Sequence, residues 1–266
     1  MKNSFIFLAI ILILSGCNNP QEDTYPEKPA AEILQSFVED FCLDPTAGEP
    51  VSFGVRVRGE GGGDWHIEVK GKVEGEDKVQ VTLHQGFPAE PIGYYNMDIS
   101  TLNKVYREDV TILTSMGKAR ASDIAPVEFD VTEGFTPGAE YWERLSLLTF
   151  HFWTRGQPEI VKFDKKYSRI VHGGNVVLFY YQRGLRSAWF QIEKGQHINE
   201  DPKDQINPFP SMFIITRGKA ESKIGGLQQT IEAGEMLFVP KGITHEFWNP
   251  NDKPCEFILI MFGEGA

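Results

Sequence analysis

Residues 234–249 read GEMLFVPKGITHEFWN, and this stretch decides the fold of the C-terminal part of the chain. The apolar run at 236–239 predicts a short β-strand. Pro240 cannot donate a backbone hydrogen bond and Gly242 permits a positive φ, so we expect the chain to turn sharply there. A return strand then begins at His245, and strand periodicity places this side chain on the same face as the residue two positions later.

The stretch fills every position of the spacing G-x5-P-x-G-x2-H-x3-N, which resembles the second sequence motif of the cupin family. The five residues are Gly234, Pro240, Gly242, His245 and Asn249. On this resemblance, residues 159–266 are identified as a member of the cupin family. The resemblance implies an all-β jelly-roll barrel whose motif histidine points into the barrel and helps to hold a metal.

The pattern from residue 167 onward also favours an all-β domain. Short apolar segments recur at regular spacing, and glycines separate them, which is typical of a β-sandwich or barrel. The expected strands are 176–181, 188–192, 212–216, 220–224, 227–231, 236–239, 246–248 and 256–261.

The first cupin motif, G-x5-H-x-H-x3-4-E-x6-G, would supply two histidines and a glutamate, and this chain departs from it. If Gly218 is the final glycine, Ser211 takes the place of the glutamate. In a register anchored at Gly195, His197 comes too early, and neither register puts a histidine in a histidine place. Those places hold Asp204 or Gln205 and Ile206 or Asn207 in the first register, and Asp201 and Lys203 in the second.

His245 is therefore the one motif histidine, and we assign it as a ligand-binding residue together with His197, Asp204 and Gln205. Three imidazoles and a carboxylate suit Fe, Mn, Ni or Zn. Because only one of these ligands is in its place, we predict no cofactor and assign no catalytic residue. A divalent metal held by His245 with substitute ligands stays an open alternative. A further alternative makes His245 a hydrogen-bonded histidine inside the barrel.

The first residues of the chain predict export and lipidation. Lys2 precedes an apolar run at 5–14, which is short for a membrane span of about 20 residues and suits a signal peptide. Leu-Ser-Gly-Cys at 14–17 resembles the bacterial lipobox, which implies cleavage after residues 1–16 and acylation of Cys17, for example with palmitate. The alternative is an ordinary signal peptide with an incidental cysteine. Residues 17–29 are polar and predict a flexible tether.

Charge sets the expected partners and location. A net charge of -11 and a pI near 5.1 argue against nucleic acid as a partner, because nucleic-acid binding needs basic surfaces. Membrane contact is then expected through the lipid rather than through a basic patch. Asn18 is not the aspartate that signals inner-membrane retention in enteric bacteria. We therefore expect a lipid anchor in the cell envelope, with the outer membrane favoured.

Cysteines and the remaining histidines carry little further information. Cys42 and Cys255 either pair in an oxidising compartment or remain separate buried thiols. The histidines that fall in no motif are His66, His84, His151 and His172.

The N-terminal half predicts a mixture of helices and strands. Residues 29–42 carry apolar side chains at helical spacing and predict a helix. A glycine-rich hairpin turn is expected at 61–64. Strands are expected at 51–58, 65–69, 79–84 and 127–131, and helices at 97–106 and 110–116.

This order of elements across residues 30–137 resembles an SCP2-type sterol-carrier domain. Ser122 and Asp123 stand where that family has a second glycine. The resemblance implies an α+β fold, in which a sheet and its helices enclose a hydrophobic tunnel for fatty-acyl or sterol-like ligands. In the alternative, the apolar residues only pack a core. The similar segments are 53–55, 65–69, 79–83, 97–102 and the glycine-lysine turn at 115–118.

The two domains are joined by residues 138–158, which are dense in apolar residues and predict a connecting helix packed between the domains. We expect a membrane-anchored envelope lipoprotein that binds a small or lipidic molecule through both domains and is not an enzyme. Two alternatives stay open. One is a cupin enzyme, such as a metal-dependent oxygenase or isomerase, that uses His245 with substitute ligands. The other is a protein-interaction module, and a homodimer through the barrel is considered as a further partner.

Overall fold

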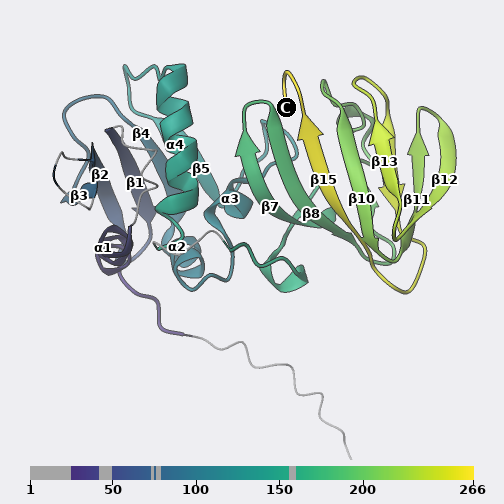
Figure 1. The fold of residues 1–266 in the computed structure, drawn as a ribbon. Coiled ribbons are helices and arrows are strands. Elements are labelled where there is room, and N and C mark those ends of the chain that lie inside the picture. The colour runs from purple at the N-terminus through teal and green to yellow at the C-terminus, as the bar shows by residue number, and fades with distance from the viewer. Residues whose placement is uncertain (1–24, 42–49, 73–74, 76–78, 156–159) are drawn as a thin grey trace, which may run out of the picture.

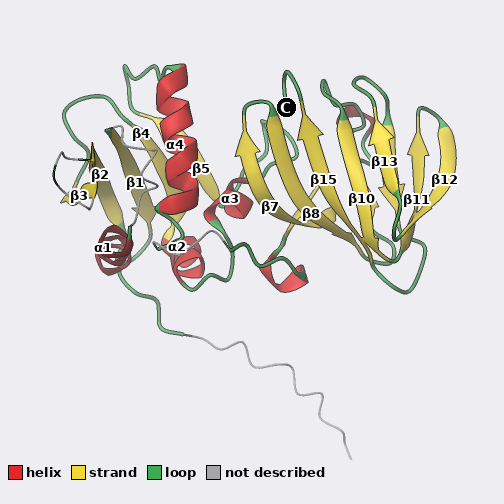
Figure 2. Cartoon of the chain, viewed as in Figure 1, coloured by secondary structure: helices red, strands yellow, loops and turns green. Residues whose placement is uncertain are grey.

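The computed structural model describes residues 25–41, 50–72, 75, 79–155 and 160–266. Two parts lie side by side, a sheet with helices and an all-β barrel (Figure 1, Figure 2). The signal peptide, Cys17 and Cys42 lie outside the described residues, so the predictions about them stay predictions. Within the described residues, no helix combines the length and the apolar character needed to cross a membrane.

The N-terminal part is a five-stranded sheet with helices packed against it. The strand order is β3-β2-β1-β4-β5, in which β1 and β4 are parallel and the other neighbours are antiparallel. The helices are α1 (Ala30–Asp40), α2 (Ile99–Tyr106), α3 (Ile112–Met116) and α4 (Ala139–His151). The strands are β1 (Val51–Arg58), β2 (Gly63–Lys72), β3 (Val79–Gln85), β4 (Gly93–Asp98) and β5 (Val127–Val131).

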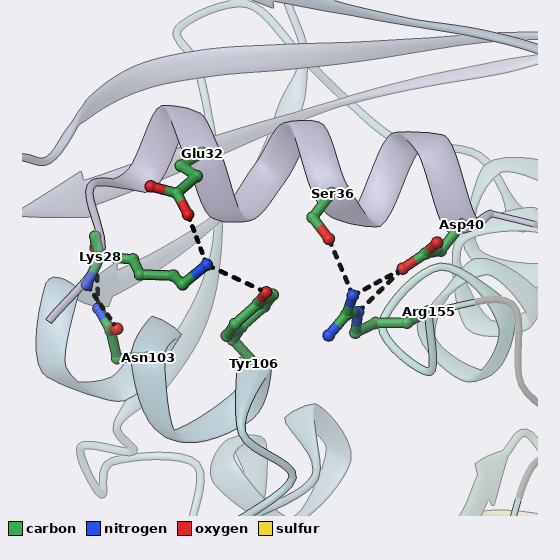
Figure 3. Close-up of polar contacts among 7 residues, drawn as sticks. All are labelled: Lys28, Glu32, Ser36, Asp40, Asn103, Tyr106 and Arg155. Carbon is green, nitrogen blue, oxygen red and sulfur yellow. Dashed lines mark hydrogen bonds and ion pairs between the residues drawn. The ribbon is translucent and has the colours of Figure 1, made fainter. Parts of the chain in front are cut away.

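The side chains of β1 alternate between the two faces of the sheet, and this alternation explains how the core forms. Phe53 and Val55 face the helices and are fully buried, and they meet the apolar side of α1 through Phe37. At the start of α1, the amide N of Lys28 donates to Oδ1 of Asn103 on α2 at 2.9 Å, which ties the two helices together (Figure 3).

Strand β4 was not predicted, and the helix expected at 97–106 begins later, at Ile99. Tyr95 and Met97 belong to β4, are fully buried, and lie beside Val55 and Val57 of β1 in parallel pairing. This pairing joins segments that are far apart in sequence, so local spacing could not reveal it.

Helix α4 contacts both parts of the molecule. Leu145 and Leu148 are buried in the N-terminal core, while the ring of Phe150 stacks on Tyr180 of the barrel at 5.1 Å between centroids. Within the helix only these two leucines are buried, so α4 is less enclosed than its apolar content suggested.

The C-terminal part is built from two sheets that enclose an apolar core (Figure 1). One sheet has the order β13-β10-β15-β8-β7-β6 and the other has the order β12-β11-β14-β9. All the expected strands are present, and β6 and β9 are additional. The strands are β6 (Arg169–Val171), β7 (Gly174–Gln182), β8 (Leu185–Ile192), β9 (His197–Ile198), β10 (Ser211–Arg217), β11 (Lys219–Ile224), β12 (Leu227–Glu232), β13 (Met236–Val239), β14 (His245–Trp248) and β15 (Cys255–Phe262).

The turn between β13 and β14 has the conformation expected from its sequence. Gly242 has a φ of +79°, which favours glycine. Asn249, the last residue of the motif, is buried, and its Nδ2 donates to the carbonyls of Ile192 and Lys253, both at 2.9 Å. This asparagine therefore fixes the loop that leads into β15.

The two parts are joined by specific polar contacts as well as by apolar packing. The guanidinium of Arg169 donates to the carbonyl oxygens of Thr114 and Gly117 at the end of α3, at 2.8 and 2.9 Å. The amide of Leu178 on β7 donates to Thr114 Oγ1 at 3.0 Å. Helix α3 is thus held directly against the barrel.

Candidate functional site

The motif histidine lies inside the barrel among neutral polar groups. His245 is 3% exposed at the start of β14. Its Nε2 lies 3.4 Å from Nδ2 of Asn207, and its Nδ1 lies 3.3 Å from the carbonyl oxygen of Ile243. One neutral tautomer satisfies both contacts, with the proton on Nδ1 and the lone pair on Nε2. Asn207 Nδ2 also donates to Oγ of Ser211 at 3.3 Å.

These contacts decide the register of the first motif. Asn207 contacts His245 and also contacts Ser211, and these two residues take the places of the second histidine and the glutamate in the register anchored at Gly218. The first histidine place then belongs to Gln205, whose carbonyl accepts from the amide of His245 at 2.9 Å. Counting back, the motif's first glycine place belongs to Asn199, which has a φ of +58°. Asparagine tolerates this left-handed conformation better than most residues.

Each residue assigned to the site from sequence now has a place. Gln205 lies next to His245, and its Nε2 donates to the carbonyl of Asn199 at 3.1 Å. Asp204 instead pairs with Arg120 of the N-terminal part, and its Oδ1 lies 2.7 Å from the arginine Nε. His197 does not share a site with His245. Its partner residue on the neighbouring strand is Trp248, and Trp248 and His245 point to opposite faces of the four-stranded sheet.

The structure also brings in a histidine that carried no motif. His172 precedes β7 and has a φ of +54°, and a charge on its ring lowers the pKa of His245. Burial lowers the pKa of His245, and repulsion from His172 adds to this effect. Burial also lowers the pKa of His172, against an opposing attraction from Asp204 and Asp123. Both shifts favour the neutral form of each ring. His172 and His245 are far apart in the sequence, so no local pattern could reveal their interaction.

The donors around His245 do not fit the metal that the motif implies. In the register anchored at Gly218, Gln205, Asn207 and Ser211 stand in the places of two histidines and a glutamate, so two amides and a hydroxyl replace two imidazoles and a carboxylate. Neutral amide and hydroxyl groups are weak ligands for Fe, Mn, Ni or Zn. Among the described residues, no group of three or more His, Cys, Asp or Glu side chains is arranged to hold a metal ion.

The barrel interior next to His245 is filled by aromatic rings. Phe213 lies 5.8 Å from the His245 ring and 4.6 Å from Phe247, measured between centroids. Phe257 continues the cluster at 5.5 Å from Phe213, and Phe190 stacks on Phe257 at 5.3 Å. Such a cluster packs the barrel as a core, and His245 forms its polar end.

An apolar pocket of about 240 Å³ lies where the two parts meet. Both parts contribute to its wall, and most of the lining side chains are aliphatic or aromatic. They include Val110, Ile112 and Leu113 around α3, Phe150 and Trp153 around the end of α4, Ile160 and Val161 after it, and Leu178 and Phe179 on β7.

Arg155 lies at the rim of this pocket. Its side chain fastens the end of α4 to α1 (Figure 3). Its Nη2 donates to Asp40 Oδ2 at 2.8 Å and to Ser36 Oγ at 3.0 Å. Its guanidinium also lies over the ring of Tyr106, 4.5 Å from the centroid. Lys162, another rim residue, pairs with Glu108 at 2.9 Å. The pocket therefore has an apolar wall and a rim of paired charges, a composition that the linear sequence did not reveal.

Comparisons with known proteins agree with the barrel. Residues 189–261 match the family model described as "Cupin domain". The C-terminal part of this chain is a cupin domain of type 2, with the jelly-roll barrel that the motif implied. A search of the curated proteins found no match.

Solved structures similar to part of this chain share little sequence with it. One is a Cupin 2 conserved barrel domain protein from Salinispora arenicola, with 17% identity and a TM-score of 0.35 over 40% of this chain and 90% of that chain. Another is an RmlC-like cupin from Methanocaldococcus jannaschii, with 13% identity and a TM-score of 0.34 over 41% and 93%. A third is a predicted oxalate decarboxylase from Thermotoga maritima, with 15% identity and a TM-score of 0.31 over 34% and 79%.

Proposed function

We propose that this protein is a lipid-anchored protein of the bacterial cell envelope that binds a small apolar or lipidic molecule without catalysing a reaction. The observation that carries the proposal is the pocket between the two parts. Its wall comes from α3, the end of α4 and β7, so the site exists only when both parts are in place. Binding pockets are often found at such domain junctions.

The size and lining of the pocket indicate the ligand class. A cavity of about 150 Å³ lined by aliphatic and aromatic side chains holds benzene. A volume of about 240 Å³ therefore suits a larger apolar group, such as part of an acyl chain or a fused ring. Removing the apolar surface of such a ligand from water favours its binding.

The N-terminal part supports the same ligand class. Its element order is helix, three antiparallel strands, a fourth strand parallel to β1, two short helices and a fifth strand. This order is compatible with an SCP2-like domain, whose ligands are fatty-acyl or sterol-like. The pocket does not lie inside that domain, because Phe37, Phe53 and Phe152 fill its core. We therefore place the ligand at the junction with the barrel.

Anchoring is proposed from the lipobox at residues 14–17. A single acyl chain binds membranes only marginally, whereas two or more hold a protein stably. We expect Cys17→Ser to move the protein out of the membrane fraction or to leave its precursor uncleaved. A Cys17→Ser protein that is processed and still membrane-bound would contradict the anchor.

A homodimer through the barrel is supported by the outer face of the six-stranded sheet. The adjacent strands β13, β10 and β15 present a continuous apolar surface there. An uncharged surface of this kind can pack against the same surface of a second copy of the chain. We expect Ile214→Glu to convert a dimer to a monomer in light scattering, with Leu227→Glu at the exposed β11–β12 turn as the control. A wild-type monomer would contradict the dimer. The surface residues are Met212, Ile214, Met236, Phe238, Ile258, Ile260 and Phe262.

Direct analysis of bound material tests the proposed ligand class. The mature full-length protein, purified from its membrane fraction, should yield a co-purifying apolar molecule on organic extraction and mass spectrometry. The same extraction from an unrelated lipoprotein of the same preparation controls for carried-over membrane lipid. Equal extracts from both proteins would count against a specific ligand.

A further inference from the structure

A groove lies on the outer face of the four-stranded barrel sheet, apart from the pocket between the two parts. It measures about 510 Å³ and is lined by side chains from β9, β11, β12 and β14. We call it the outer groove, and its principal side chains are Gln196, His197, Lys223, Gln228, Glu246 and Trp248.

The carboxylate of Glu246 is the fixed polar centre of the outer groove. His197 Nε2 donates to Glu246 Oε2 at 3.0 Å, and Lys223 Nζ lies 3.5 Å from Glu246 Oε1. The Glu246 side chain is only 17% exposed, and each of its two carboxylate oxygens has one of these cationic or N–H partners. Each carboxylate oxygen has further lone pairs that can accept hydrogen bonds from a ligand.

Trp248 supplies a flat apolar surface beside this carboxylate. It lies two residues after Glu246 on β14 and therefore on the same outward face. Its ring centroid is 5.5 Å from that of His197, with the planes tilted by 50°. The barrel core lies on the other face of β14, where Phe247 is fully buried, so Trp248 is not needed to fill that core.

We propose that the outer groove binds a sugar ring of a neutral carbohydrate. A pyranose ring has an apolar face of C–H groups, which would pack on Trp248, and a rim of hydroxyl groups. Those hydroxyls would donate to Glu246 and accept from Lys223 and from the amide of Gln228. Paired charges at Glu246 and Lys223 favour a neutral ligand over a strongly charged one.

The chemistry of the groove disfavours other ligands. The net charge of -11 and the carboxylate at its centre oppose a nucleic-acid or phosphate ligand. The lysine beside Glu246 opposes a metal cation. This inference goes beyond the proposed lipid binding and shares no residue with the pocket between the two parts. Failure of one proposal therefore leaves the other standing.

Calorimetric titration of the mature full-length protein with maltotriose, cellotriose and chitotriose tests the inference. We expect saturable binding of at least one of these trisaccharides. Trp248→Ala should weaken that binding by at least about tenfold, because the stacking surface is lost. Trp142→Ala removes a partly exposed tryptophan on α4 and should leave the affinity unchanged. Absence of binding by all three sugars at millimolar concentration overturns the proposal.

Glu246→Gln provides a second variant that keeps the shape of the side chain. Charge-assisted hydrogen bonds contribute more than neutral ones, so we expect this change to weaken sugar binding by about tenfold or more. If Trp248→Ala does not fold, Glu246→Gln decides the matter. Wild-type affinity in a folded Glu246→Gln protein overturns the proposal.

Discussion

Arg120 and Asp204 form a two-point ion pair between the N-terminal part and the barrel. The arginine Nε lies 2.7 Å from Asp204 Oδ1, and its Nη2 lies 2.8 Å from Oδ2. Asp201 adds a contact to the same Nη2 at 2.5 Å. A residue that the sequence offered as a ligand for a barrel site thus holds the two parts together. Asp204 directly precedes Gln205, so the ion pair between the two parts is connected to the loop that carries the first-motif residues.

Arg120→Gln should loosen the junction without unfolding either part. The variant loses the parallel pair of hydrogen bonds that fixes the orientation of the two parts. We expect faster amide hydrogen exchange in α3 and in residues 201–205 than in the wild type. Arg107→Gln breaks an ion pair with Asp109 inside the N-terminal part and serves as the control. Equal exchange in both variants and the wild type would show that the ion pair does not hold the junction.

Two motif glycines should respond differently to an added side chain. Gly242 and Gly218 have φ values of +79° and +70°, so each variant bears backbone strain of roughly 1–3 kcal/mol. A Cβ at Gly242 meets nothing within 4 Å, whereas one at Gly218 would lie 2.2 Å from the carbonyl oxygen of Pro254. Gly218→Ala should therefore lower the free energy of unfolding more than Gly242→Ala does. Urea denaturation of both variants measures the difference, and an equal loss would contradict the steric account.

Stability should fall as the pH drops below about 6.5, the ordinary pKa of histidine. Burial keeps the pKa of His245 and His172 lower in the folded protein, so the unfolded chain takes up protons first. Between pH 6.5 and its lowered pKa, each ring changes the free energy of unfolding by at most about 1.4 kcal/mol per pH unit. Above pH 6.5 the folded protein keeps the full stability, and the loss occurs as the pH falls through this window. His245→Gln should flatten the decline in free energy of unfolding between pH 8 and pH 5. The half-exposed His84, changed to Gln, is the control. An unchanged slope in His245→Gln would contradict the account.

The purified mature protein should hold well below one transition metal per chain. The reason is the donor set at His245, in which Asn207 and Ser211 replace two of the usual metal ligands. Elemental analysis after mild chelation provides the measurement. Asn207→His together with Ser211→Glu restores motif ligands and should raise the metal content. Near-unit Fe, Mn, Ni, Cu or Zn in the wild type, lost in a folded His245→Ala protein, would contradict this prediction and favour an enzyme.

The sequence predicted the barrel well because its signals are local. Pro240 and Gly242 fix a turn, and alternation around it fixes which side chains enter the core. The register of the first motif could be narrowed to two choices, but only the contact between Asn207 and His245 selects one. The strand at β4 was missed because its partner β1 is distant in sequence.

The residues that form the candidate sites were harder to predict because their partners are also distant in sequence. His197 and His245 are both histidines of one barrel, and only the pairing of β9 with β14 shows that they lie on opposite faces. Leu178 and Ile112 meet at the pocket because Arg169 and Thr114 hold α3 against β7. Contacts of this kind depend on how two domains dock, which no local pattern encodes.

Binding of a dansyl-labelled fatty acid to the mature full-length protein tests the central claim most directly. Leu113→Trp fills the pocket between the two parts, while Leu227→Trp adds the same bulk at an exposed turn of the barrel. Fluorescence titration should show saturable binding to the wild type and to Leu227→Trp, and at least about tenfold weaker binding to a folded Leu113→Trp protein. No binding to the wild type, or equal affinity in all three proteins, would contradict an apolar ligand site between the two parts.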